Sequence, residues 1–215
     1  MIRNIVFDMG QVLLEFDPDR IITALGYAGE DADILRREVF KSAEWVAGDR
    51  GSMTEEEIVA SVCRRLPERL HTAAEDCVCS WWKHRRTPID GMEELICELK
   101  ELGFGVYVLS NANKRLHEYA KWLPGSEKLD GLFVSADWLL LKPEREIFEK
   151  FYSLYGLEPS ECFFVDDNPA NIEGAARTGM SGAVFYGDAG RLRRELNAAG
   201  VPVRTAGEST AGENR

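Results

Sequence analysis

The sequence predicts an α/β protein whose core is a doubly wound parallel sheet, with an all-α segment inserted into it. From residue 88 onward, short apolar runs alternate with segments whose apolar residues recur every three or four positions, which is typical of alternating strands and helices. Residues 17–86, in contrast, contain helical patterns only. The 215 residues are enough for one core and a smaller appended unit.

We therefore expect three parts along the chain. The α/β core consists of residues 1–16 and 87–205, and a helical cap consists of residues 17–86. Residues 206–215 are expected to be a frayed tail without stable structure.

The core elements are expected to alternate along the chain. The strands are predicted at residues 4–7, 104–109, 132–135, 162–165 and 182–185. The helices are predicted at residues 92–102, 114–122, 144–155, 169–178 and 188–199. Asn168 can cap the fourth of these helices, Pro169 suits its first position, and Gly156 and Gly179 are suitable stops.

The cap contains a clear helix start. Thr54, followed three residues later by Glu57, forms a capping-box pattern before an apolar helical face. Residues 34–40 and 70–82 are also predicted to be helical.

Four polar segments each follow an apolar run in the predicted core. They are Asp8, Ser110-Asn111, Lys142-Pro143 and Asp166-Asp167. We expect each run to be a strand, and the carboxyl ends of parallel strands meet at one edge of the sheet, so these segments should converge. An acid, a hydroxyl, a lysine and an acid pair suit a divalent cation and a phosphoryl group.

Composition limits the partners and the compartment. The formal net charge of −11 argues against nucleic acid or an anionic membrane surface as a partner. The sequence suggests neither a signal peptide nor a membrane-spanning run. The five cysteines are odd in number and lack the spacing of a zinc site, so we expect reduced thiols and a cytoplasmic protein.

Together, these motifs resemble those of the haloacid dehalogenase-like phosphohydrolases, in the branch with a helical cap after the first motif. The residues Phe7-Asp8-Met9-Gly10-Gln11, followed by Asp17-Pro18-Asp19-Arg20, resemble the sugar phosphatases that act on glucose 1-phosphate. The resemblance covers residues 2–187.

The resemblance implies a role for each acid of the motifs. Asp8 would be the nucleophile and would bind Mg²⁺ together with the main-chain carbonyl of Gly10. One acid of the pair Asp166 and Asp167 would complete the metal site, and we favour Asp167. Taken alone, Asp8 would be interpreted as a turn residue at a strand end, and the acid pair can serve to cap a helix.

The remaining motif residues would handle the phosphate. Ser110 and Asn111 would hold its oxygens, and Lys142 would balance the charge of the acid and the phosphoryl group. The alternatives are an ordinary Ser-Asn turn and a solvated lysine.

The chain departs from the family pattern at one position. Most phosphatases of this family carry a second Asp two positions after the nucleophile, where this chain has Gly10. Losing a general acid typically costs about 10²–10⁴ in rate. Asp17, Asp19 and His84, near the two expected hinges of the cap, are candidate replacements.

The resulting prediction is a Mg²⁺-dependent phosphomonoester hydrolase of a small phosphorylated metabolite, with sugar phosphates as the first class to test. Trp45, Trp81 and Trp82 can stack on a sugar ring or fill the cap core. A 2-haloacid dehalogenase and a non-catalytic phosphate-binding module that lost its acid at Gly10 are the alternatives. We expect a monomer or small homo-oligomer.

Overall fold

The structure is a computed structural model that describes residues 1–84 and 87–205, without the side chain of His84. The predicted tail at 206–215 lies outside the described residues. Five parallel strands form one sheet in the order β3-β2-β1-β4-β5. Their bounds are β1 Asn4–Phe7, β2 Gly105–Ser110, β3 Gly131–Val134, β4 Cys162–Asp166 and β5 Ser181–Val184.

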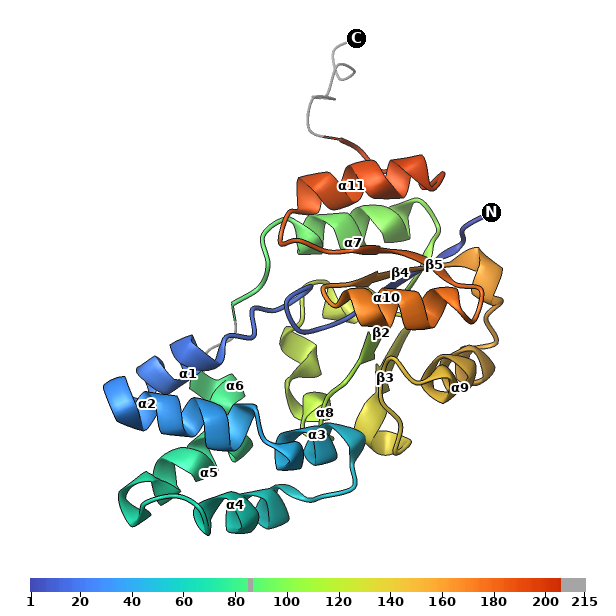
Figure 1. Cartoon of the computed structure of the whole chain (residues 1–215). Helices are drawn as coiled ribbons and strands as arrows, with labels where there is room; N and C mark the ends of the chain where they lie inside the picture. Colours follow the sequence, from blue (N-terminus) through green and yellow to red (C-terminus); the bar gives the residue numbers. More distant parts are fainter. Residues whose placement is uncertain (85–86, 206–215) are drawn as a thin grey trace, which may run out of the picture.

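This sheet is covered by helices on both faces, which confirms the predicted doubly wound α/β fold (Figure 1). The five core helices are α7 Met92–Glu101, α8 Leu116–Tyr119, α9 Arg145–Tyr155, α10 Pro169–Ala176 and α11 Ala189–Ala198. As predicted, Asn168 caps α10 and Gly156 ends α9 in a left-handed conformation.

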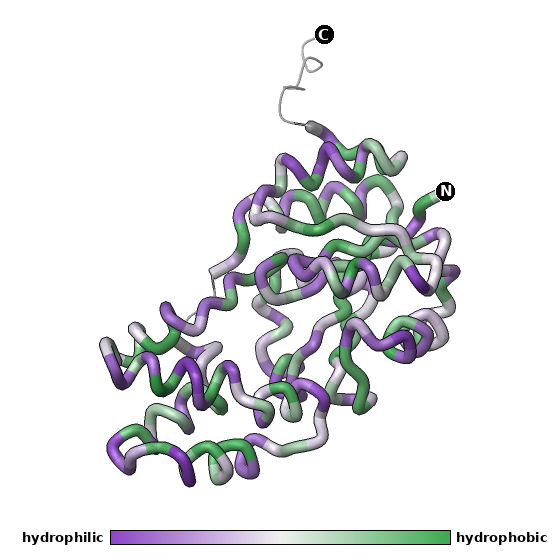
Figure 2. The backbone as a smooth tube through the Cα atoms, viewed as in Figure 1, coloured by the Kyte–Doolittle hydropathy of each residue, from purple (hydrophilic) through white to green (hydrophobic). Residues whose placement is uncertain are grey.

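Alternation along the strands creates the two apolar layers. Ile5 and Phe7 of β1 pack with residues of α7 and α11, whereas Val6 faces α9 on the opposite side. All three side chains are fully buried, as expected for a parallel sheet sandwiched between helices. In Figure 2 hydrophobic and hydrophilic residues alternate along the helices, as expected for helices that bury one face.

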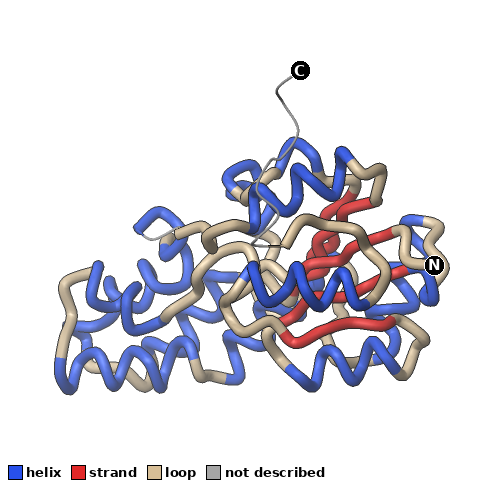
Figure 3. Tube along the Cα trace, turned by 90° about the horizontal axis from the view of Figure 1, so that it is seen from above, coloured by secondary structure: helices blue, strands red, loops and turns tan. Residues whose placement is uncertain are grey.

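A block of helices lies between β1 and α7, and we call it the cap. Its α-helices are α1 Pro18–Ala24, α2 Gly29–Leu35, α3 Ala43–Arg50, α4 Glu55–Cys63, α5 His71–Cys79 and α6 Trp81–His84. The cap extends to one side of the sheet (Figures 1 and 3). It has an apolar cluster of its own, which includes Ile22, Leu35, Val62 and Leu70. The predicted capping box of Thr54 and Glu57 is present at the start of α4.

Two predicted helices of the cap differ from expectation. Residues 34–40 combine the end of α2 with a π-helical turn over Arg36–Phe40. The segment 70–82 is broken at Ser80. The break has a packing reason, because Cys77 and Val78 belong to the cap cluster, whereas Trp81 and Trp82 turn to pack against the core.

The apolar run before Lys142 was wrongly expected to be a strand. Residues 139–141 are irregular, and they follow β3 after a 3₁₀ turn over Ser135–Asp137. Leu139 adopts a φ of 59° and is exposed. Leu140 is partly buried, and Leu141 is buried. Leu140 packs against the apolar cluster that contains Phe133 of β3, and none of the three leucines pairs within the sheet.

Candidate active site

Asp8 is the first residue after β1 and lies at the carboxyl edge of the sheet. Its main-chain N–H donates to Val165 O at 2.8 Å, which continues the sheet pairing by one residue. Its Oδ1 accepts the N–H of Met9 at 2.7 Å. Two central strands therefore fix the position of this carboxylate.

Lys142 forms ion pairs with two carboxylates. Its Nζ lies 2.9 Å from Oδ1 of Asp8 and 2.7 Å from Oδ2 of Asp166, and it donates to Leu109 O at 2.9 Å. The side chains of Lys142 and Asp166 have no exposed surface. Buried charges of this kind persist only when they are paired and hydrogen-bonded, and this lysine meets both conditions.

Asp166 is saturated by donors. Besides Lys142, it accepts the main-chain N–H of Asn168 at 2.8 Å and the side-chain amide of Asn171 at 3.0 and 3.1 Å. Asn168 also caps α10, and Asn171 lies in the first turn of that helix, so the start of α10 holds Asp166 in place.

The charged groups in this cluster shift one another's pKa values. Burial raises the pKa of Asp8 to about 6, against the attraction of Lys142. Burial alone would lower the pKa of Lys142, but the two carboxylates reverse the effect and raise it. Partial desolvation and the charge of Asp166 raise the pKa of Asp167. Lys142 is therefore a fixed ammonium group that neutralises the acids around it.

Asn111 acts on the loop that carries Lys142. Its side-chain amide donates to Lys142 O at 3.0 Å, and its Oδ1 accepts the Lys142 N–H at 2.8 Å. This reciprocal pair of hydrogen bonds joins the end of β2 to an irregular segment and fixes the position of the Lys142 main chain. Ser110, also at the end of β2, is buried and lines a cavity with Asp8.

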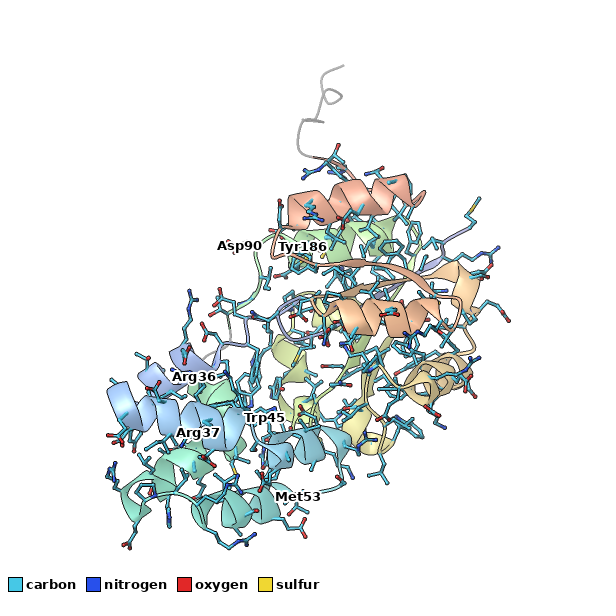
Figure 4. All side chains as sticks on the ribbon, in the orientation of Figure 1. Arg36, Arg37, Trp45, Met53, Asp90 and Tyr186 are labelled. Atoms are coloured by element: carbon cyan, nitrogen blue, oxygen red, sulfur yellow. The ribbon has the colours of Figure 1, made fainter. Side chains whose placement is uncertain are left out.

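That cavity has a volume of about 230 Å³ and lies between the sheet edge and the cap. Its lining combines polar groups, among them Asp8, Ser110 and Asp167, with aromatic side chains. The aromatic lining residues, called the cavity wall below, are Phe16, Trp45, Trp81 and Tyr119. Phe16 packs edge-on against Trp81 at 5.0 Å between ring centroids. Figure 4 labels Trp45 at the junction of cap and core.

Three of the predicted site residues form an acidic cluster. Single carboxylate oxygens of Asp8, Asp166 and Asp167 lie within 4.8 Å of one another. Asp166 is already satisfied by Lys142 and Asn171, whereas Asp167 is exposed and lines the cavity. Oxygen donors with excess negative charge fit a hard divalent cation such as Mg²⁺. Gly10, whose carbonyl was predicted as a further ligand, also lines the cavity.

The predicted replacement acids do not reach this cavity. Asp17 caps α1 by accepting the N–H groups of Asp19 and Arg20, and Asp19 pairs with Arg36. Neither lines the cavity that contains Asp8. The side chain of His84 lies outside the described residues.

Sequence reasoning missed Asp49, near the end of α3, which lines the same cavity as Asp8. Burial, with repulsion from Asp8, raises the pKa of Asp49 to about 8, against a smaller lowering influence of Asn113 and Trp45. No motif marks this residue. The only signal is its spacing of four from Trp45, which places both on one face of a short helix.

The end of α3 is joined to the core by several contacts. The hydroxyl of Ser135 donates to the main-chain oxygen of Asp49, and Arg50 forms an ion pair with Glu144. A Cβ on Gly51 would lie 2.2 Å from Ala136 O, so only glycine permits this approach. The cap thus holds Asp49 over the cavity.

Comparison of the sequence with known protein families identifies the family of this chain. The model of the haloacid dehalogenase-like hydrolases matches residues 2–179, so the chain belongs to this family of hydrolytic enzymes. This confirms the family expected from the motifs.

The curated relatives are named as hydrolases or phosphatases. The chain is 28% identical over 185 residues to the D-ribitol-5-phosphate phosphatase of Bacteroides thetaiotaomicron, covering 80% of this chain and 86% of that protein. It is 26% identical over 159 residues to flavin mononucleotide hydrolase 1 of Arabidopsis thaliana, covering 74% of this chain and 63% of the relative. The chain therefore spans less than two thirds of the length of that second relative.

Solved structures show the same fold. A haloacid dehalogenase family enzyme from Bacteroides thetaiotaomicron, in complex with magnesium and inorganic phosphate, matches with a TM-score of 0.70 at 21% identity, covering 89% of this chain and 99% of that one. The L-2-haloacid dehalogenase of Xanthobacter autotrophicus matches with a TM-score of 0.62 at 20% identity, covering 94% and 84%. Within the described residues, no helix has the length and apolarity that crossing a membrane requires.

Proposed function

We propose that this protein is a Mg²⁺-dependent phosphomonoester hydrolase of small metabolites that works through an aspartyl phosphate on Asp8. The observation that carries the proposal is the buried Lys142, which pairs with both Asp8 and Asp166 beside a small cavity. A carboxylate that is paired with a lysine, held at a strand end and faces this cavity is suited to attack phosphorus.

The contacts of Asp8 favour one oxygen as the nucleophile. The Met9 N–H and the Lys142 ammonium group both approach Oδ1. We assign the attack to Oδ2, while Lys142 holds the carboxylate in place and offsets the charge of the incoming phosphoryl group. Ser110 and the main-chain N–H groups of the turn at Asn111 would bind the other phosphate oxygens.

The metal site would consist of Asp8, the Gly10 carbonyl and Asp167. Asp166 would act mainly as a positioning residue, because Lys142 and Asn171 already satisfy its oxygens. When bound, Mg²⁺ would supply positive charge that offsets the charge of the phosphate oxygens. The donor set supports this choice, since carboxylate and carbonyl oxygens are the ligands that Mg²⁺ prefers.

The cavity wall suggests the substrate class. The rings of Phe16, Trp45 and Trp81 present apolar faces to whatever is attached to the phosphate. Such faces pack well against the C–H side of a sugar, so we propose sugar phosphates as the first substrates to test. Two relatives, a ribitol-5-phosphate phosphatase and a flavin mononucleotide hydrolase, are named for substrates that are phosphate monoesters.

The acidic cluster argues against the dehalogenase alternative. A haloacid substrate carries a carboxylate, and a site with Asp167 next to Asp8 would repel it in the absence of a cation. Chloride release without added Mg²⁺ would revive that alternative.

The proposed function is tested by a phosphate-release screen over sugar, nucleotide and lipid phosphates, with and without Mg²⁺. We expect turnover of at least one class with Mg²⁺, and none by Asp8→Asn. Asp33→Asn, an exposed acid on α2, is the matched control and should retain activity. Phosphate binding without release by the parent protein would instead support a non-catalytic module.

Metal binding has a readout that does not need activity. Mg²⁺ should raise the melting temperature of the parent, because a ligand that binds only the folded state stabilises it. The shift should be largely lost in Asp167→Asn and kept in Asp33→Asn. An equal shift in all three proteins would contradict the assigned ligand set.

A further inference from the structure

We propose that Asp49, which the cap places in the cavity, is the proton donor to the leaving group and later activates the hydrolytic water. This assignment rests on the proposed phosphatase function and supplies the general acid that Gly10 cannot provide. Asp49 would be a catalytic residue in the strict sense, because its carboxyl would contact the oxygen that leaves phosphorus.

The first argument is position. Asp49 lines the same cavity as Asp8 but comes from the cap rather than from the sheet. The nucleophile is fixed to the sheet, and attack in line with the departing bond places the leaving oxygen on the side opposite the nucleophile. A donor from the cap is therefore on the correct side of the phosphorus.

The second argument is that the end of α3 is held in place. The main-chain oxygen of Asp49 accepts a hydrogen bond from Ser135, and Gly51 approaches the main chain of Ala136 so closely that no Cβ fits between them. Trp45, one turn earlier in α3, lines the same cavity. A general acid needs such fixed geometry relative to the atom that it protonates.

The third argument is the charge of its surroundings. Asp8 and Asp167 line the cavity as acids, and Tyr119 faces Asp49 from α8. Among the described residues that line the cavity, none is a lysine, arginine or histidine. Burial, with repulsion from Asp8, raises the pKa of Asp49 to about 8, which favours the protonated form that a general acid needs.

The reaction then balances in two steps. In the first, Asp8 forms a bond to phosphorus as the ester bond to the leaving oxygen breaks, and that oxygen takes the proton of Asp49. In the second, water attacks the phosphorus of the aspartyl phosphate, gives its proton to the Asp49 carboxylate and releases Asp8. Phosphate and alcohol are the products, and both side chains return to their starting state.

A leaving-group series tests the assignment. Phenyl phosphates with increasingly electron-withdrawing para substituents, ending with para-nitrophenyl phosphate, need progressively less protonation of the departing oxygen. For Asp49→Asn we expect kcat/KM to fall about 10²–10⁴-fold on phenyl phosphate, the usual size of a lost general acid. On para-nitrophenyl phosphate the loss should be well under tenfold.

Controls separate this inference from the proposed function. Asp33→Asn should match the parent across the series, and Asp49→Glu should restore part of the activity on phenyl phosphate. An equal loss on every ester would show a structural role for Asp49, and no loss on any ester would exclude it from catalysis. If the parent releases no phosphate above background, or if Asp8→Asn releases as much as the parent, the proposed function fails. This inference then fails with it.

Discussion

The ammonium group of Lys142 lies 2.9 Å from Oδ1 of Asp8, and the lysine side chain has no exposed surface. The same nitrogen lies 2.7 Å from Oδ2 of Asp166, so one cation serves two acids. This arrangement makes the lysine part of both the stability and the chemistry of the site, because removing one member of a buried ion pair leaves the others unpaired.

Lys142→Met should therefore destabilise the protein by about 3–5 kcal/mol and lower kcat/KM by at least about 10²-fold. The stability deficit should shrink as the pH falls. Without Lys142 the pKa of Asp8 rises further, so a proton taken up at lower pH removes the unpaired charge. Urea unfolding at several pH values measures this, with exposed Lys128→Met as control. A variant as stable as the parent at neutral pH would contradict the account.

The roles of Ser110 and Asn111 can be separated by phosphate inhibition. Because the Asn111 amide is engaged with the main chain of Lys142, Asn111→Ala should lower kcat and leave the inhibition constant of inorganic phosphate nearly unchanged. Ser110→Ala should weaken phosphate inhibition by several-fold. The reverse pattern would give Asn111 the anion-binding role that the sequence first suggested.

The site residues that could be predicted from the sequence are those at the ends of strands. Asp8, Ser110 and Asp166 directly follow or end buried strands, and an apolar run that breaks into a polar residue marks such a strand end well. Lys142 was placed at the same site for a partly wrong reason. The leucines that precede it form an irregular segment, and periodicity cannot distinguish such a segment from a short buried strand.

The cap was less predictable for a related reason. Its helical character is clear from the sequence, but the side that each helix presents to the core depends on tertiary contacts. Asp49 reaches the cavity because Ser135 and Gly51 hold the end of α3 against the core. Neither contact has a local sequence signature, whereas Asp17 and Asp19 looked suitable by position and instead stabilise the first cap helices.

Asp49 should make stability depend on pH in a characteristic direction. Burial and repulsion from Asp8 raise its pKa from 3.8 to about 8, so between these values the folded state holds a proton that the unfolded state has lost. The free energy of unfolding then falls as pH rises, by up to about 1.4 kcal/mol per pH unit for this group. Asp49→Asn removes that dependence.

The stability of Asp49→Asn relative to the parent should therefore increase from about pH 4 to about pH 8 and stay level above pH 8. Urea unfolding of both proteins across this range provides the measurement, with Asp33→Asn expected to track the parent. A difference between Asp49→Asn and the parent that is constant with pH would contradict the buried, protonated carboxyl.

Gly51 allows a test of how the cap meets the core. In Gly51→Ala the new Cβ would lie 2.2 Å from Ala136 O, and the residue has a φ of 80°. Gly103→Ala is a matched control, with a φ of 85° and no atom within 4 Å of the new Cβ. Both should lose about 1 kcal/mol from backbone strain. Only Gly51→Ala should also lower kcat/KM, because the clash moves α3 and Asp49 away from the cavity; equal activities of the two variants would refute this.

The covalent intermediate on Asp8 is the central claim, and chemical trapping tests it most directly. The protein is mixed with Mg²⁺ and the best substrate of the phosphate screen, quenched in acid during turnover, and reduced with borohydride, which converts an acyl phosphate to an alcohol. Peptide mass spectrometry should then find homoserine at position 8 and an unmodified side chain at Asp166, Asp167 and Asp49. Phosphate release without any modification at position 8 would contradict the account.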